Sequence, residues 1–112
     1  MALSRGAIVV VASRGAYTGK PRPALVVQSD LFNETHASVT ICPITSDRVE
    51  APLFRLTLPG GARTGLRRVS QIMVDKIVTV PRTSVGAQIG RCDPTEIEAV
   101  EEALRLWLGM DL

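Results

Sequence analysis

The stretch Arg22–Val27, with the sequence Arg-Pro-Ala-Leu-Val-Val, has the pattern of a buried β-strand that follows a cation. A second apolar run, Val39–Ile44, comes later in the chain and leads directly into Thr45. Runs of this length that are rich in β-branched residues and bounded by turn residues favour strands. If the two strands are neighbours, Arg22 and Thr45 lie at one rim of a sheet. A guanidinium and a hydroxyl at such a rim would fit a phosphodiester between them.

Short apolar runs separated by turn residues dominate positions 6 to 80. The predicted strands are Ala7–Ala12, Ala24–Val27, Val39–Ile44, Leu53–Leu58 and Ile72–Val80. In residues 54–58 apolar and polar residues alternate, which predicts one buried face with Arg55 and Thr57 on the outer face. Five short strands in a small chain usually curl into a barrel, because closure removes unpaired edges. We therefore expect a mainly β protein with a half-open barrel.

Residues 93–108 have the pattern of an amphipathic C-terminal helix. Asp93 can cap it, Pro94 suits the first helical position, and Glu96 completes a capping box. Its apolar stripe, which we expect to pack on the barrel or on a second subunit, consists of Ile97, Val100, Leu104 and Trp107. A shorter helix is predicted from about Leu31 to Ala37, with Ser29 or Asp30 as its cap.

The length of 112 residues predicts one domain, residues 1–112, with a single modest core. No apolar run approaches the roughly 20 residues of a membrane-spanning helix. Arg5 and Gly6 precede the apolar run near the N-terminus and no small-residue cleavage site follows it, so we expect no signal peptide and a cytoplasmic location. Cys42 and Cys92 lack metal-ligand spacing and are predicted to be buried thiols, although the sequence leaves a disulfide between them open.

The formal net charge of +2 is the sum of two unlike parts. Residues 1–92 carry twelve Lys and Arg against five Asp and Glu, which gives +7, whereas residues 93–112 carry one against six, which gives −5. A basic body with an acidic helix favours a polyanionic ligand on one face. The plainer interpretation, that the arginines only keep the protein soluble, stays open.

These residues resemble the MazF and PemK group of bacterial toxins, messenger-RNA endonucleases that share an SH3-like half-open antiparallel barrel with the gyrase poison CcdB. The resemblance covers nearly the whole chain. It is carried by Arg5–Val9, Gly19–Val27, Asn33, Pro43–Ser46, Gly65-Leu66, the Val-Asp-Lys-Ile-Val-Thr-Val run at 74–80, and Ile89-Gly90. The combination of Arg-Pro-Ala-Leu-Val-Val with Pro-Ile-Thr-Ser at this separation is the most specific part.

The resemblance implies a toxin of a type II toxin-antitoxin system that cleaves single-stranded RNA by 2′-hydroxyl attack. The expected products are a 2′,3′-cyclic phosphate and a 5′-hydroxyl, formed with no cofactor and no metal. Arg22 and Thr45 are implied as the catalytic pair, with Ser46 and Asp75 as further catalytic or RNA-contacting candidates. Physical chemistry supports the charge-stabilising part of that role, since a guanidinium binds phosphate oxygens bidentately. His36, the single histidine, is expected to be a surface residue.

Cations and one aromatic residue are candidates for guiding the RNA strand. They are Arg14, Tyr17, Lys20, Arg67, Arg68 and Lys76. The resemblance also implies a homodimer whose RNA groove spans both subunits, and a separate antitoxin whose acidic disordered segment occupies that groove. The position two residues before Asp75, which is arginine in the PemK branch, is Met73 here.

Other interpretations stay open at the level of sequence. Arg22 could instead pair with Asp30 or Asp75, and Thr45 could bond its own backbone in an ordinary turn. The whole chain could be a CcdB-like gyrase poison without nuclease activity, since Trp107–Met110 resembles the ending of those toxins. A third possibility is an adaptor that binds nucleic acid or protein without either activity.

Overall fold

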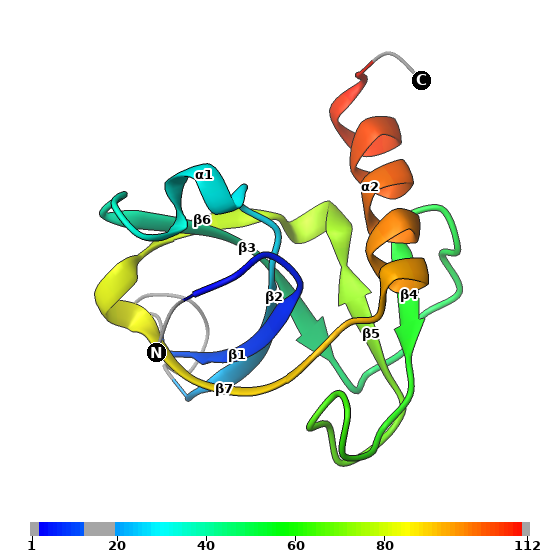
Figure 1. Ribbon diagram of the computed structural model, residues 1–112. Coiled ribbons are helices and arrows are strands. Elements are labelled where there is room, and N and C mark those ends of the chain that lie inside the picture. The colour runs from blue at the N-terminus through cyan, green and yellow to red at the C-terminus, as the bar shows by residue number, and fades with distance from the viewer. Residues whose placement is uncertain (1–2, 13–19, 111–112) are drawn as a thin grey trace.

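A computed structural model describes residues 3–12 and 20–110 of the chain. Seven antiparallel strands and a C-terminal helix make up the fold (Figure 1). The strands are β1 (Ala7–Val11), β2 (Arg22–Val26), β3 (Ser38–Thr45), β4 (Arg55–Leu58), β5 (Ser70–Met73), β6 (Val78–Pro81) and β7 (Val85–Arg91). The helices are α1 (Asp30–Asn33) and α2 (Pro94–Leu108), with 3₁₀ turns η1 (Val74–Lys76) and η2 (Arg82–Ser84).

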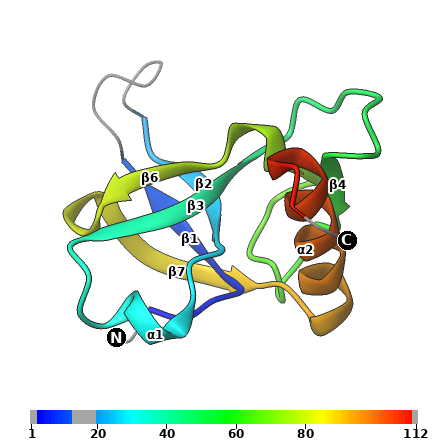
Figure 2. The same ribbon diagram turned by 90° about the horizontal axis from the view of Figure 1, so that it is seen from above.

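The sheet has the order β4-β5-β3-β2-β1-β7, and β6 pairs with β3 beside this path. Strands β1, β2, β3, β6 and β7 curl around one another, while β4, β5 and α2 lie together on the other side of the molecule (Figures 1 and 2). The sheet does not close completely. The expectation of a half-open antiparallel barrel with a C-terminal helix is therefore confirmed.

The central strands are buried on both faces, which explains why their sequences are almost continuously apolar. One face contributes to a core beneath α2, formed around Ile8, Leu25, Ile44, Ile72 and Val100. The other face lines the interior of the barrel, with Val9, Val26, Val39, Ile41 and Val80. Alternate residues of the same strand thus enter two different cores.

Two strand predictions were wrong. The run Ile72–Val80 is not one strand, because the chain turns at η1 and separates β5 from β6. Strand β7, Val85–Arg91, was missed, since its glycines and polar residues hide the strand pattern. Leu53–Leu58 is also shortened, as β4 begins only at Arg55.

Helix α2 agrees with its predicted start. The Asp93 side chain accepts from the Glu96 amide and the Glu96 side chain accepts from the Asp93 amide, so the capping box is present. Trp107 packs against Phe54 with ring centroids 5.3 Å apart, but 47% of it remains exposed. The first helix is shorter than predicted: α1 ends at Asn33, and Ser29 is its cap.

Both cysteines are free and buried, so the disulfide alternative is excluded. Burial raises the pKa of each thiol to about 12, with the nearby acidic groups as lesser causes. Both thiols therefore stay protonated at neutral pH. In the parts of the chain that the structure describes, no helix is long and apolar enough to cross a membrane.

Candidate active site

The ends of several strands meet at one rim of the sheet, and this rim brings Arg22 and Thr45 together. Strands β2 and β3 pair antiparallel with Ala24 opposite Pro43 and Leu25 opposite Cys42. Continuing this register by two residues aligns Arg22 with Thr45. Residues opposite each other in an antiparallel pair point to the same face of the sheet. On this extended register the arginine and the hydroxyl would project from the same face of the sheet, at the ends of neighbouring strands.

Arg22 is exposed at the start of β2. Within the described part of the chain, no hydrogen bond or ion pair engages its guanidinium. The two carboxylates proposed as alternative partners are occupied elsewhere. Asp30 accepts from the Arg5 amide and from Asn33, and Asp75 is bound by Arg55. The interpretation that Arg22 closes the barrel through Asp30 or Asp75 is therefore wrong.

Thr45 is half-buried at the end of β3. Its Oγ1 accepts a hydrogen bond from the Asp47 amide at 3.0 Å, so the predicted local turn is present. This contact uses the oxygen only as an acceptor. The hydroxyl proton of Thr45 therefore remains available to a further acceptor. Thr45 can therefore accept the Asp47 bond of the local turn and still donate a hydrogen bond to a ligand at the rim.

The row of side chains continues onto the next two strands. Thr45 lies opposite Gln71 of β5, and Gln71 lies opposite Thr57 of β4. The side chain of Gln71 bonds the backbone of Val49 and thereby reaches the loop that follows Thr45. An open cleft of about 650 Å³ lies there, lined by Ser46, Asp47, Arg48, Val49, Glu50, Thr57 and Gln71. Of the sequence candidates that the structure describes, only Ser46 lines this cleft.

Gln71 and Arg48 were not singled out from the sequence. Gln71 is a polar residue in a strand whose next residue, Ile72, belongs to the core. That alternation is a signal for the opposite face, but it does not say which neighbours the side chain meets. Arg48 stands in a polar loop, where an arginine is unremarkable in sequence.

Asp75 and Lys76 lie in η1, at the other end of β5 from the rim. Arg55 binds both carboxylate oxygens of Asp75, at 2.8 Å from Nε to Oδ1 and 3.2 Å from Nη2 to Oδ2. The side chains are only 12% and 16% exposed, so Arg55 does not point into solvent as the alternation predicted. Hydrogen bonding from Arg55 holds the pKa of Asp75 below its usual value. Asp75 is thus kept ionised and paired with Arg55, the first residue of β4.

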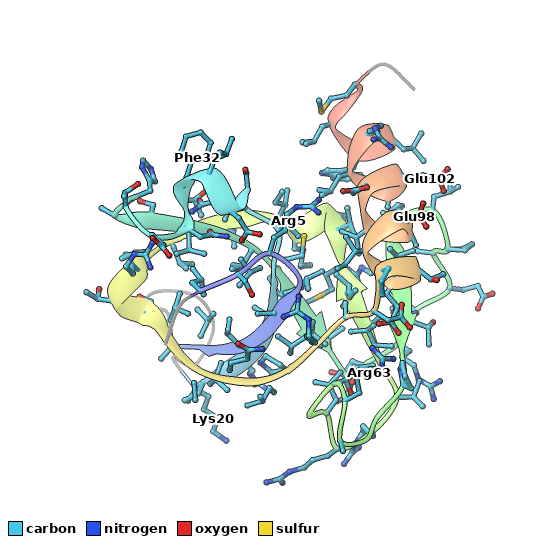
Figure 3. All side chains as sticks on the ribbon, in the orientation of Figure 1. Arg5, Lys20, Phe32, Arg63, Glu98 and Glu102 are labelled. Atoms are coloured by element: carbon cyan, nitrogen blue, oxygen red, sulfur yellow. The ribbon has the colours of Figure 1, made fainter. Side chains whose placement is uncertain are left out.

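The remaining cations differ in where they lie. Lys20 lies two residues before β2, and Arg67 and Arg68 lie two to three residues before β5. These three exposed residues are therefore at the same end of the sheet as Arg22. Figure 3 shows Lys20 projecting from that end of the molecule. Arg14 and Tyr17 lie outside the described residues.

Comparison with known proteins places this arrangement in a family. A family model described as "PemK-like, MazF-like toxin of type II toxin-antitoxin system" matches residues 4–108, almost the whole chain. The chain belongs to this toxin family. Its sequence is 45% identical to a protein named "Probable endoribonuclease MazF" from Mycolicibacterium smegmatis. The match covers 96% of this chain and 98% of that protein.

Solved MazF structures have the same fold. The Mycobacterium tuberculosis toxin MazF-mt6 superposes with a TM-score of 0.82 over 95% of this chain and 99% of that one, at 24% identity. A MazE-MazF structure from Deinococcus radiodurans superposes with a TM-score of 0.80. The match covers 99% of this chain and 100% of that chain, at 26% sequence identity. These findings confirm the resemblance to MazF and PemK and do not favour the CcdB-like gyrase poison.

Proposed function

We propose that this MazF-like toxin is a metal-independent endoribonuclease that cleaves single-stranded RNA by attack of a ribose 2′-hydroxyl on the adjacent phosphate. The observation that carries the proposal is the alignment of exposed Arg22 with Thr45 at one rim. Its family and its relatives named as endoribonucleases support the reaction class.

Arg22 acts by electrostatics. As the 2′-oxygen attacks, the phosphate acquires additional negative charge on its non-bridging oxygens. A guanidinium can donate two parallel hydrogen bonds to those oxygens and stays charged throughout, because its pKa exceeds 12. The guanidinium has no protein partner among the described residues, so its donors need not be withdrawn from another contact before RNA binds.

Thr45 supplies a second donor to the same phosphate. Because Oγ1 already accepts from the Asp47 amide, the hydroxyl is held in place and its proton points elsewhere. Arg22 and Thr45 then approach the phosphate from neighbouring strands. Fixed donors of this kind stabilise a transition state without reorganising during the reaction.

The first test is the removal of the guanidinium. We expect Arg22→Ala to lower cleavage of a long single-stranded RNA about 100-fold or more, as loss of one transition-state donor does. The matched control is Arg105→Ala, which removes an exposed arginine of α2 and should cleave like the unmodified chain. Undiminished cleavage by an Arg22→Ala protein with an unchanged thermal unfolding curve would end the proposal.

The second test concerns the metal and the products. Among the described residues, no three His, Cys, Asp or Glu side chains gather as a metal site requires. We expect cleavage to persist in EDTA and to leave a 2′,3′-cyclic phosphate and a 5′-hydroxyl, which mass spectrometry of the fragments identifies. Loss of cleavage in EDTA with recovery in Mg²⁺ would contradict this mechanism.

The proposed partners follow from the same surface. A solved structure of MazF from Deinococcus radiodurans contains MazE, and we propose that a cognate antitoxin likewise binds this chain through an acidic disordered segment. A cationic rim attracts such a segment as it attracts RNA, so the antitoxin would block the site. We also propose that the toxin acts as a homodimer in the cytoplasm, where its RNA substrate is found.

A further inference from the structure

Gln71 is a buried polar residue with an unusual pair of contacts. Only 7% of it is exposed. Its Nε2 donates to the Val49 carbonyl at 2.9 Å and its Oε1 accepts from the Val49 amide at 3.0 Å. The side-chain amide thus bonds Val49 as the backbone of a neighbouring strand would. Losing both bonds would leave two backbone groups of the loop without their protein partner.

These bonds fix the loop that follows the catalytic Thr45. Residues 46–50 are irregular and exposed, and side chains from the sheet hold them at two points. Thr45 bonds the Asp47 amide and Gln71 bonds both backbone groups of Val49. Arg48 lies between the two attachment points. Since Thr45 and Gln71 are cross-strand neighbours, the loop is fastened next to Thr45.

Residues of the fastened loop line the 650 Å³ cleft, together with Thr57 of β4 and Gln71 of β5. Among the described residues that line the cleft, the two acidic residues Asp47 and Glu50 outnumber the one cation, Arg48. A net negative lining disfavours a phosphate. Carboxylate oxygens instead accept hydrogen bonds from the amino groups of bases, and a guanidinium can stack on an unpaired base. The chemistry of the cleft therefore suits a base.

We propose that this cleft binds the base next to the cleaved bond and that Gln71 is the positioning residue that holds it open. The preferred base carries an exocyclic amino group, as adenine, cytosine and guanine do and uracil does not. Gln71 makes no contact with RNA in this assignment, because its amide is occupied by Val49. The inference rests on the proposed endoribonuclease function and adds the source of its base preference.

The test uses the full chain and short RNA substrates that vary at the positions flanking the mapped cut. Gln71→Met keeps the volume of the side chain but removes both bonds to Val49. We expect KM to rise about 10-fold or more, kcat to change far less, and the preference for an amino-bearing base at one flanking position to flatten. Gln88→Met is the matched control, since Gln88 bonds the Gly90 carbonyl within β7, away from the cleft. It should keep wild-type KM and preference.

A purely structural role for Gln71 gives a different result. It would lower the active fraction, and therefore kcat, without changing KM or the base preference, and that outcome overturns the proposal. Thr57→Tyr covers the case in which Gln71→Met does not fold, because it occupies the cleft from an exposed strand position and leaves Gln71 in place. We expect the same rise in KM and loss of preference.

Thr57→Tyr with unchanged KM and preference would also overturn the proposal. Cleavage by the wild-type chain distinguishes a failure of the proposed endoribonuclease function from a failure of the base site alone. If it leaves RNA intact, the proposed function fails. If it cleaves, but folded Gln71→Met or folded Thr57→Tyr retains its KM and base preference, only the base site fails.

Discussion

Asp75 illustrates at the residue scale how the fold assigns a role that the sequence leaves open. It was a candidate for catalysis or RNA contact, yet both of its carboxylate oxygens are bound by Arg55 in a largely buried pair. A guanidinium that loses its carboxylate in such a setting remains charged and poorly solvated. We therefore assign Asp75 to stability and leave it out of the proposed catalytic pair.

The corresponding prediction is that Asp75→Asn lowers the free energy of unfolding by about 2 to 3 kcal/mol, the contribution of hydrogen bonds to charged groups. The folded fraction should cleave RNA at the wild-type rate. Urea denaturation and an activity assay normalised to folded protein measure both. A large loss of kcat without a loss of stability would instead return Asp75 to the catalytic site.

This stability contribution depends on pH in a defined direction. Because Arg55 lowers the pKa of Asp75 in the folded state, the contribution is complete above the unfolded pKa of about 3.8 and is lost as the pH falls through the folded value. The difference in stability between wild type and Asp75→Asn should thus be constant near neutral pH and shrink below about pH 4.

At the scale of elements, the loop between β4 and β5 is docked on β7 through close backbone contacts. Gly65 has φ +72°, and a Cβ there would lie 2.0 Å from the Ile89 carbonyl oxygen. Gly90 faces the same contact, where a Cβ would lie 2.2 Å from the Thr64 carbonyl carbon. This docking holds the segment that carries Arg67 and Arg68 against the barrel.

We predict that Gly65→Ala is more destabilising than Gly109→Ala. Both glycines are left-handed, with φ +72° and +69°, so the backbone cost of about 1 to 2 kcal/mol is common to both. Gly109 has open space around it, and only Gly65 adds a clash. The additional loss should be about 1 to 3 kcal/mol by thermal or urea unfolding. Equal losses would show that the loop moves away freely.

At the scale of the whole molecule, charge is divided between two regions. Glu98 and Glu102 project from the outer side of α2, whereas Lys20 projects from the distant rim (Figure 3). Exposed cations at the rim end of the sheet include Lys20, Arg22, Arg67 and Arg68. An RNA strand bound there would release counterions, and the acidic helix would stay outside the contact.

We therefore predict that binding of a 2′-O-methyl RNA, which cannot be cleaved by 2′-hydroxyl attack, weakens steeply with salt. Four phosphate contacts give a slope of about −3 in a plot of log K against log salt concentration for a single strand. Arg68→Ala should reduce the slope by roughly 0.7. A slope near zero would mean that the rim cations do not contact phosphate.

The sequence predicted well wherever local chemistry decides the outcome. The capping box of α2 involves only the four consecutive residues 93–96 and was correct in detail. The buried runs of β1, β2 and β3 were recognised because they are apolar on both faces. Strand β7 was missed because glycines and polar residues interrupt its apolar pattern. Its Gly90 serves a close contact with the β4–β5 loop, which local strand propensity cannot reveal.

The sequence by itself determined the central strands, the C-terminal helix and the presence of Arg22 and Thr45 at strand ends, since these depend on short-range patterns of apolar and capping residues. Only the tertiary structure decided that Thr45, Gln71 and Thr57 form one row beside the β2 end that carries Arg22, and that Arg55 pairs with Asp75. The physical reason is strand register. It is set by pairing between segments distant in the chain, and a shift by one residue would move every side chain to the opposite face.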